Sequence, residues 1–594
     1  MTDQKTTGAE EVRWDLTQLY PGIEALDRDL KLAAEQGRFF GDRYRGIVSE
    51  LPAPELAAAL ADLEVIQDRI GRAFTFAYLD WSTDTADPAR GALLQRVREG
   101  YTALAQDILF FELEWTQVDD DRVAGLLAAP ELVRYRHYLE VQRLHKPHML
   151  SEPEEKILVE KSVTGKSAWD RFFDETMGSM RYELDGQQKT QQEVMALLHE
   201  KDRSTRSVAA QSFTDGLVKQ IRTSTFIFNT VLADKASDDR LRSYPSWISS
   251  RNRSNEVSDD VVDALVGAVS GRFDLVGRFY RLKRRLLGLD EMMDYDRYAP
   301  VGEASTSYDW DSAKALVLDA YTQFHPSMGE ITRKFFDERW IDAALAPNKR
   351  SGAFSHGAVP SAHPYVLMNY TGRVRDVQTL AHELGHGVHQ YLSRDQGIFH
   401  ADTPLTTAET ASVFGEMLVF QRLISTERDD ANRLAMLVAK IDDTVATVFR
   451  QVAMNRFEHR IHTERRERGE LSVESLSNAW IETQQAMFDG AVTLGDHYRY
   501  WWSYIPHFLH TPGYVYAYAF GELLVLALYA RYKEVGPSFA DDYLALLAAG
   551  GSDWPHVLVG RLGIDLTDHS FWAEGLGAIE DLVAEAESLA ARSG

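Results

Sequence analysis

The chain contains no cysteine, and this absence narrows its chemistry at once. Disulfides, thiolate zinc ligands and cysteine nucleophiles are excluded together, so any metal site must use histidine, aspartate or glutamate. The chain also lacks an apolar run long enough to span a bilayer, and residues 1–15 are polar and charged instead of resembling a signal peptide. We therefore expect a cytoplasmic protein that makes no membrane contact.

Positive charge is scarce, because 64 Lys and Arg residues stand against 90 Asp and Glu residues, and the formal net charge is -26. Such a chain repels nucleic-acid phosphates and anionic membrane surfaces, so neither is an expected partner. Cationic peptides would be attracted at low ionic strength. With 594 residues and a hydrophobic content of 44%, the chain can bury an extensive core, which favours a large folded enzyme over a disordered protein.

The segment Ala381-His382-Glu383-Leu384-Gly385-His386 contains an HExxH motif in a predicted helix. Because a helix advances 3.6 residues per turn, His382 and His386 project from one face and can bind the same metal ion. Zinc accepts neutral imidazoles, leaves a position open for water, and needs a nearby carboxylate to take the proton, which is the role that suits Glu383. A helix that carries two histidines by chance is the weaker alternative.

A third metal ligand is expected between residues 406 and 416, which we interpret as the start of a second helix. Glu409 and Glu416 lie two turns apart there, on one face. Glu409 would complete a His2Glu set with the two histidines, or it would close the helix N-terminus in a capping box with Thr406; the spacing leaves both open. Glu416 is a candidate for orienting a ligand imidazole, and ordinary helix surface is its alternative.

An apolar run at residues 365–370 follows a long irregular segment, residues 347–364, and predicts a strand before the HExxH helix. An edge strand at this place would bind an extended peptide through backbone hydrogen bonds, so we assign substrate binding to Tyr365, Val366 and Leu367. The alternative is a buried strand that only supports the helix, since edge exposure cannot be read from a sequence.

Helical periodicity dominates elsewhere, as in residues 431–468 and 523–532. A short hairpin is predicted at residues 181–186 around Asp185-Gly186, and Thr190-x-x-Glu193 then forms a capping box that opens the next helix.

Tyrosine, tryptophan and histidine are concentrated in residues 497–518. Tyrosine hydroxyls and an imidazole N–H can stabilise an oxyanion, but most of these rings, including Tyr500, Trp501 and Trp502, are expected to form an aromatic core.

The runs at residues 376–389 and 404–416 resemble oligoendopeptidase F, of the thimet oligopeptidase family of zinc metallopeptidases, and residues 139–169 are similar to its N-terminal region. The resemblance implies that Glu409 is the third zinc ligand. It implies a mainly α fold, a large helical body with a small β-sheet near the active site and a deep substrate channel. We expect residues 1–188 to form an N-terminal helical domain and residues 189–594 the catalytic zinc metallopeptidase domain.

Two stretches within residues 506–518 resemble the family segment that contributes substrate-binding and transition-state residues. The resemblance implies catalytic roles for His507, Tyr514 and Tyr518. The thimet branch has its histidine at a position between His507 and His510, so either imidazole is a candidate for contacting the substrate. His507 is favoured, and His510 is retained as a substrate-binding residue.

Together these observations predict a zinc-dependent endopeptidase with one Zn²⁺ per chain that hydrolyses internal peptide bonds. The resemblance to the family implies that its substrates are short unstructured peptides. One alternative is an exopeptidase on the same scaffold, in which Lys349 or Arg350 captures the carboxylate of the substrate. Another is a catalytically silent peptide-binding protein whose metal is only structural. The sequence specifies neither the side-chain preference nor the oligomeric state.

Overall fold

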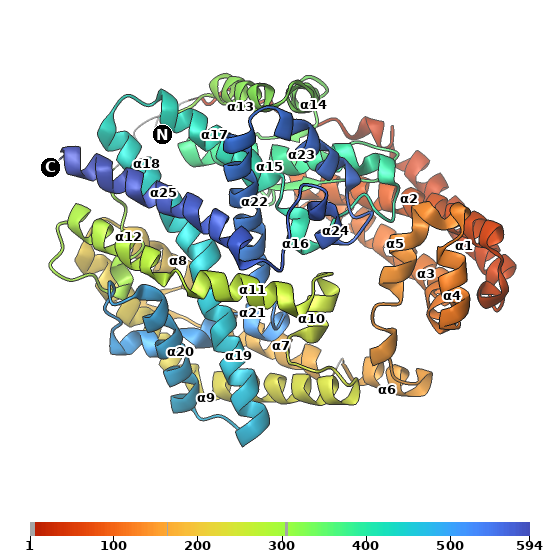
Figure 1. The fold of residues 1–594 in the computed structure, drawn as a ribbon, viewed down its shortest axis with the longest axis horizontal. Coiled ribbons are helices and arrows are strands. Elements are labelled where there is room, and N and C mark those ends of the chain that lie inside the picture. The colour runs from red at the N-terminus through yellow and green to blue at the C-terminus, as the bar shows by residue number, and fades with distance from the viewer. Residues whose placement is uncertain (1–5, 163, 303–306, 594) are drawn as a thin grey trace. The chain divides into compact units, whose positions relative to one another are not determined.

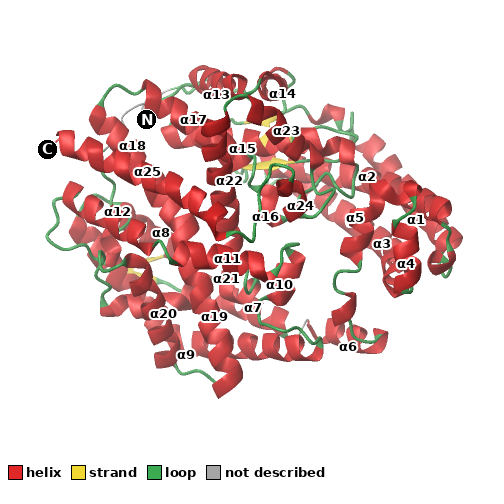
Figure 2. Ribbon diagram, in the orientation of Figure 1, coloured by secondary structure: helices red, strands yellow, loops and turns green. Residues whose placement is uncertain are grey.

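The computed structural model describes residues 6–162, 164–302 and 307–593, and helices make up most of it (Figure 1, Figure 2). The described strands form one sheet of two strands and one sheet of three. The predicted mainly α fold with a small β-sheet is therefore confirmed, whereas the deep channel stays a prediction. Among the described residues, no helix is long and apolar enough to cross a membrane. The cytoplasmic location also stays a prediction.

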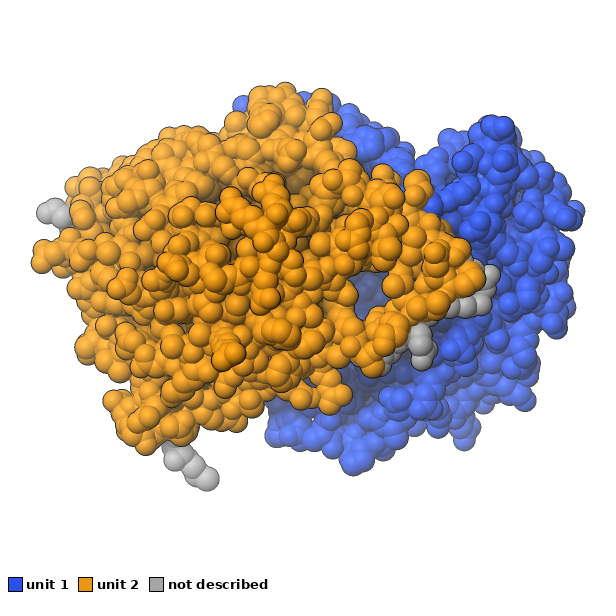
Figure 3. Space-filling model, turned by 90° about the horizontal axis from the view of Figure 1, so that it is seen from below, with its two compact units in different colours: residues 1–146, 306–426, 531–564 blue, residues 147–305, 427–530, 565–594 orange. Residues whose placement is uncertain are grey.

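The chain forms two compact units, and each is assembled from three separate stretches of sequence (Figure 3). Unit 1 consists of residues 1–146, 306–426 and 531–564. Unit 2 consists of residues 147–305, 427–530 and 565–594. These units are defined by compactness in space, so the predicted division of the sequence at residue 188 stays a prediction.

Unit 1 contains the N-terminal helices and the helix that carries the HExxH motif. Its helices are α1 (Ile23–Tyr44), α2 (Ala53–Thr83), α3 (Pro88–Gln117), α4 (Asp120–Leu127), α5 (Arg136–Gln142), α13 (Trp310–Phe324), α14 (Pro326–Asp337), α15 (Val374–Ser393), α16 (Leu405–Ala408), α17 (Ser412–Thr426), α23 (Ser538–Ala549) and α24 (Pro555–Gly560). In α2, buried Leu56, Leu60, Leu63 and Ile70 recur at intervals of three, four and seven residues, which is the pattern of a helix with one apolar face. That face packs on α1 and α3.

A three-stranded sheet in unit 1 consists of β3 (Ile341–Asp342), β4 (Phe354–His356) and β5 (Tyr365–Leu367). Its order is β3-β5-β4, with β5 parallel to β3 and antiparallel to β4. The strand at residues 365–367 is therefore central and fully buried, so the prediction that Tyr365, Val366 and Leu367 form an edge strand is wrong. The edge strands are β3 and β4, and β4 lies within the segment that we expected to be irregular.

The HExxH helix α15 begins at a network around Asp376, whose carboxylate accepts hydrogen bonds from the backbone N–H groups of Thr371 and Arg373. Its apolar side is buried against α17, α14 and the sheet. Tyr321 of α13 donates a hydrogen bond to the carbonyl of Ala381, next to the motif. Contacts with α13, α14, α17 and the sheet thus fix the position of the helix that carries His382 and His386.

Residues 405–416 do not form the single helix that the spacing suggests. Helix α16 ends at Ala408, residues 409–411 form a turn, and α17 begins at Ser412. The N-cap of α16 is Pro404, with no side-chain cap, so the capping box between Thr406 and Glu409 is not formed. Glu409 instead lies at the C-terminal end of a short helix, where its side chain is available for other contacts.

Unit 2 is a second helical body with its own two-stranded hairpin. Its helices are α6 (Glu152–Ser162), α7 (Lys166–Ser179), α8 (Gln191–Ala196), α9 (Arg203–Leu241), α10 (Ser249–Ser254), α11 (Asp259–Ser270), α12 (Phe273–Leu286), α18 (Asp430–Thr444), α19 (Arg450–Arg468), α20 (Val473–Phe488), α21 (His507–His510), most of α22 (Tyr516–Val535) and α25 (His569–Ser593). A nine-residue 3-10 helix, Asp496–Tyr504, packs on α9 and α20. Trp501 and Trp502 of this segment are buried in the core, as expected.

Local sequence signals in unit 2 are confirmed. Strands β1 (Tyr182–Leu184) and β2 (Gln187–Lys189) form an antiparallel hairpin. Its two turn residues, Asp185 and Gly186, have φ values of 52° and 74°, which is the conformation that an Asp-Gly turn favours. The capping box between Thr190 and Glu193 is present at the start of α8. The helical stretch predicted at 431–468 is also found, interrupted by one π-helical segment at Val445–Phe449.

Candidate metal centre and active site

Three side chains of unit 1 converge on one point. Oε2 of Glu409 lies 3.5 Å from Nε2 of His382 and 3.4 Å from Nε2 of His386. All three ligand atoms lie within 4.8 Å of one another. Two imidazole nitrogens and one carboxylate oxygen at this spacing fit a divalent cation, and this donor set is typical of zinc hydrolases.

Close packing between α15 and α17 brings Glu409 to the histidines. A Cβ atom built on Gly385 would lie 2.3 Å from the carbonyl oxygen of Ala411 and 2.6 Å from Cα of Ser412, so only glycine fits at this contact. Ser412 also donates a hydrogen bond of 2.6 Å from its hydroxyl to Oε2 of Glu409. Our sequence reasoning missed this role of Ser412, although its position three residues after Glu409 was a usable signal.

Glu416 lies on the other side of the His382 ring. Its Oε2 is 3.5 Å from Nδ1 of His382, so the two ring nitrogens of His382 face two different carboxylates. A carboxylate at the second nitrogen fixes the orientation of a metal-binding imidazole. The contact is the one expected of a residue that orients a ligand, and it is inconsistent with ordinary helix surface.

The electrostatics of this cluster favour a bound cation. Burial lowers the pKa of His382, but the hydrogen bond with Glu416 and the charges of Glu409 and Glu383 outweigh it and raise that pKa to about 9. Burial raises the pKa of Glu409, but the hydrogen bond and charge of His386 outweigh it and lower that pKa to about 2. Three carboxylates thus surround two imidazoles, and a divalent cation at the three donors would balance the excess negative charge.

Glu383 is buried beside the cluster and is not one of its three donors. Burial raises the pKa of its carboxyl group, while the charges of His382 and His386 lower it and the negative charge of Glu409 raises it. The backbone N–H of Ser355, in the edge strand β4, donates a hydrogen bond to this carboxyl group. The carboxylate is therefore held in place between the HExxH helix and the sheet, as a general base requires.

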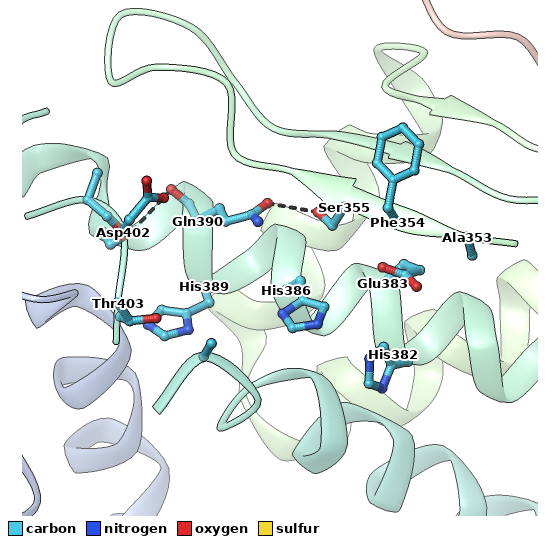
Figure 4. A pocket seen from close by; sticks show the side chains of 13 residues that line it. Ala353, Phe354, Ser355, His382, Glu383, His386, His389, Gln390, Asp402 and Thr403 are labelled. Atoms are coloured by element: carbon cyan, nitrogen blue, oxygen red, sulfur yellow. Dashed lines mark hydrogen bonds between the residues drawn. The ribbon is translucent and has the colours of Figure 1, made fainter. Parts of the chain in front are cut away.

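A cavity of about 560 Å³ lies within unit 1 between the HExxH helix and β4 (Figure 4). Its lining residues are Ala353, Phe354, Ser355, His382, Glu383, His386, His389, Gln390, Ser393, Ala401, Asp402, Thr403 and Ala408. Ser355 donates a hydrogen bond of 2.7 Å to Gln390 across one wall. Strand β4 thus borders the same cavity as His382 and His386, which places the small sheet at the candidate site.

His507, Tyr514 and Tyr518 gather in unit 2. Nε2 of His507 lies 3.3 Å from the Tyr518 hydroxyl, and the Tyr514 and Tyr518 ring centroids are 5.1 Å apart. His510 instead lies 3.0 Å from a carboxylate oxygen of Asp174. This contrast favours His507 over His510 as the substrate-contacting imidazole. The metal donors belong to unit 1, so the approach of this cluster to the metal stays a prediction.

The segment that carries Tyr514 is fastened by groups that our sequence reasoning missed. The backbone N–H of Gly513, whose φ is +76°, donates a hydrogen bond of 2.8 Å to Glu458. Asn255 donates one of 2.9 Å to the Tyr516 hydroxyl. Glu458 is fully buried in α19, and burial raises its pKa to about 8. A carboxyl group buried in a helix face has no distinctive spacing, so no motif in the sequence marks it.

Lys349, which the exopeptidase alternative needs as a free cation, is already engaged. Its ammonium lies 2.7 Å from the Asp342 carboxylate and also donates to the carbonyl groups of Asp342, Ala344 and Met368. The side chain is 1% exposed. It cannot capture the terminal carboxylate of a substrate without breaking this network, so its role is structural.

Replacing Gly385 tests whether helix packing positions the third ligand. We expect Gly385→Ala to destabilise the protein by about 1–3 kcal/mol, because the new methyl group collides with backbone atoms of Ala411 and Ser412. Displacement of this turn also moves Glu409, so zinc affinity should fall. Thermal unfolding and zinc titration measure the two effects. Gly125→Ala, in helix α4, is the control, since a Cβ atom added at Gly125 meets no atom within 4 Å. Equal losses of stability and zinc affinity in the two variants would refute the packing argument.

Comparison with known proteins gives matches over nearly the whole chain. A model of peptidase family M3 matches residues 196–578, and a model described as Oligopeptidase F matches residues 114–182. The chain is 29% identical to oligopeptidase PepF of Bacillus subtilis, covering 99% of this chain and 88% of that protein. It is 27% identical to group B oligopeptidase PepB of Streptococcus agalactiae, covering 100% and 99%.

Solved structures share the fold. A crystal structure from Chlamydophila abortus has a TM-score of 0.88 at 25% identity and covers 97% of this chain and 98% of its own. Oligoendopeptidase-F from Enterococcus faecium has a TM-score of 0.71 at 24% identity and covers 96% and 99%. The second likeness is one of fold alone, and it agrees with the helical architecture described above.

Proposed function

Since the chain belongs to peptidase family M3, a metallopeptidase family, we propose that it is a zinc-dependent endopeptidase that hydrolyses internal bonds of short unstructured peptides. The resemblance to oligoendopeptidase F that the sequence suggested is thereby confirmed. The observation that supports zinc dependence and peptide hydrolysis is the convergence of the side chains of His382, His386 and Glu409. The two histidines and Glu383 line a cavity that an edge strand borders.

In this proposal His382, His386 and Glu409 hold one zinc ion. When bound there, zinc would lower the pKa of water toward about 7 and polarise the carbonyl group of the peptide. Glu383 accepts the proton of the attacking water and returns it to the leaving amine. Glu416 keeps the His382 ring oriented, and Ser412 keeps the Glu409 carboxylate oriented, through the contacts given above.

The substrate strand of this proposal is β4, in place of residues 365–367. An edge strand leaves half of its backbone N–H and C=O groups unpaired by its own sheet, and an extended peptide can pair with them. Residues 353–355 line the cavity beside Glu383 and His386. Backbone pairing there would hold peptides of different sequence in one position, which agrees with an enzyme that cleaves many short peptides.

We also assign His507 and Tyr514 to the oxyanion that forms on the scissile carbonyl. For Tyr514→Phe we expect kcat to fall about a hundredfold with little change in KM, because a lost oxyanion donor acts mainly in the transition state. Steady-state kinetics on one fluorogenic peptide measures both constants. Tyr500→Phe is the matched control, as Tyr500 is a half-buried tyrosine outside the cluster of His507, Tyr514 and Tyr518. A Tyr514→Phe enzyme with the wild-type kcat would remove Tyr514 from catalysis.

The proposed function is tested with an internally quenched peptide that is acetylated at its N-terminus and amidated at its C-terminus. We expect cleavage at an internal bond, loss of activity with a chelator, and recovery with added zinc. A carboxypeptidase leaves this blocked peptide intact, and a silent peptide-binding protein binds it without cleavage. Activity that survives complete removal of metal would exclude the proposed mechanism.

A further inference from the structure

The cavity beside the metal donors contains a second carboxyl group, that of Asp402, at the end away from Glu383 (Figure 4). Asp402 lies in the segment between α15 and α16. The hydroxyl of Ser393, the last residue of α15, donates a hydrogen bond of 2.7 Å to the carbonyl of Ala401. This contact fixes the neighbouring Asp402 at the C-terminal end of the helix that carries the HExxH motif.

The Asp402 carboxyl group has no cationic partner among the residues that the structure describes. The described residues that line the cavity include no lysine or arginine. Surrounding protein atoms raise the pKa of Asp402, although the cavity leaves its side chain open to water. A carboxylate in a cavity without a cationic side chain is stabilised when a ligand brings a positive charge next to it.

The length of α15 sets the distance between Asp402 and the metal donors. Ser393 follows His386 by seven positions, which corresponds to roughly 10 Å along a helix. An extended peptide advances about 3.3 Å per residue, so this distance equals about three substrate residues. A cationic group three residues from the cleaved bond, or a long basic side chain nearer to it, would reach Asp402.

The direction of β4 indicates which side of the cleaved bond is involved. Ala353 lies near Glu383, and Ser355 contacts Gln390 further along α15, so β4 runs in the same sense as the helix (Figure 4). On its inner side β4 pairs antiparallel with β5, and antiparallel pairs are the more common kind. A peptide that pairs antiparallel with the outer edge has its amino-terminal residues toward Asp402.

We propose that Asp402 forms a cation-selective subsite, which binds an ammonium or guanidinium group of the substrate within about three residues on the amino-terminal side of the cleaved bond. This inference rests on the proposed peptidase function and specifies its substrate class. Two sources supply this chemistry, a lysine or arginine side chain and the free N-terminus of a short peptide. Either forms a charge-assisted hydrogen bond with a carboxylate.

Four quenched peptides of otherwise identical sequence separate these sources. Two are N-acetylated and carry arginine or the uncharged analogue citrulline three residues before the cleaved bond. The other two have the same sequences with a free N-terminus. For the wild-type enzyme we expect kcat/KM to be roughly tenfold higher with arginine than with citrulline in the acetylated pair. A gain on removing the acetyl group from the citrulline peptide would assign the subsite to the N-terminus as well.

Variants at two acidic positions then locate the subsite. In Asp402→Asn we expect the arginine-to-citrulline ratio to fall to about one, and in Asp402→Lys we expect the citrulline peptide to become the better substrate. Asp395→Asn removes an exposed charge nearby and should keep the wild-type ratio, which controls for the net charge of the protein. Zinc content and thermal unfolding verify that each variant is folded.

The outcomes distinguish this inference from the function on which it rests. A wild-type ratio near one, or an unchanged ratio in Asp402→Asn, would overturn the cation subsite and leave the peptidase intact. If the wild-type enzyme cleaves none of the four peptides in a zinc-dependent way, the proposed function itself fails. Loss of the ratio in both Asp402→Asn and Asp395→Asn would point to long-range attraction by the acidic protein and would also overturn the subsite.

Discussion

Glu383→Gln should lower kcat by about a hundred- to ten-thousandfold and leave zinc binding at the wild-type level. Glutamine has nearly the shape of glutamate but cannot accept the proton of the attacking water. Glu383 is buried beside the metal donors, where burial raises its pKa toward that of an effective base. It is absent from the three convergent donors, so the metal should remain.

Steady-state kinetics on the blocked peptide and zinc content by elemental analysis measure the two halves of this prediction. The KM should change little, because the carboxylate acts on the proton in the transition state and contributes little to peptide binding. Glu330→Gln, at an exposed position of α14, is the matched control and should retain activity. Normal turnover in Glu383→Gln would require another base, and loss of zinc would mean that Glu383 supports the metal site instead.

The features predicted correctly from the sequence depend on contacts between residues close in the chain. The hairpin needs only Asp185 and Gly186, and the capping box needs only Thr190 and Glu193. The HExxH pair likewise follows from the 3.6-residue repeat of a single helix. For Glu409 the spacing left two roles open, and the resemblance to a known family decided between them.

The features that the sequence did not reveal depend on contacts between distant residues. Strand β4 has three residues, two of them polar, and it exists because it pairs with β5 and packs on α15. Whether a strand is central or at an edge is decided by its neighbours, so residues 365–367 were misassigned. The break at residues 409–411 has the same origin, since it lies where the backbone meets Gly385 of another helix.

The proposed role of Asp402 likewise depends on contacts between residues that are not adjacent in the chain. No motif marks Asp402, and its distance from the metal donors along the chain gives no indication of function. Its position follows from the hydrogen bond between Ser393 and Ala401 at the end of α15. A cavity wall is therefore composed of residues that only the folded structure brings together, whereas the metal-binding face of one helix is already encoded in its spacing.

Glu409→Gln should weaken zinc binding more than a hundredfold, and activity should be lost at zinc concentrations that saturate the wild-type enzyme. The substitution replaces an anionic ligand with a neutral amide, which weakens one of three donors and removes the charge of the carboxylate that lies nearest to both histidines. The amide oxygen can still accept the hydrogen bond from Ser412, and the packing at Gly385 does not depend on the charge, so the fold should persist.

The zinc affinity of Glu416→Gln is the comparison for this prediction. Both carboxylates lie 3.5 Å from a ring nitrogen of His382, but only Glu409 also approaches His386. A residue that orients a ligand typically contributes ten- to a hundredfold in metal affinity or activity, so Glu416→Gln should bind zinc more tightly than Glu409→Gln. Competition with a chromophoric chelator measures both affinities directly. If the two variants bind zinc equally well, or if Glu409→Gln retains the wild-type affinity, the carboxylate that completes the metal site is not Glu409.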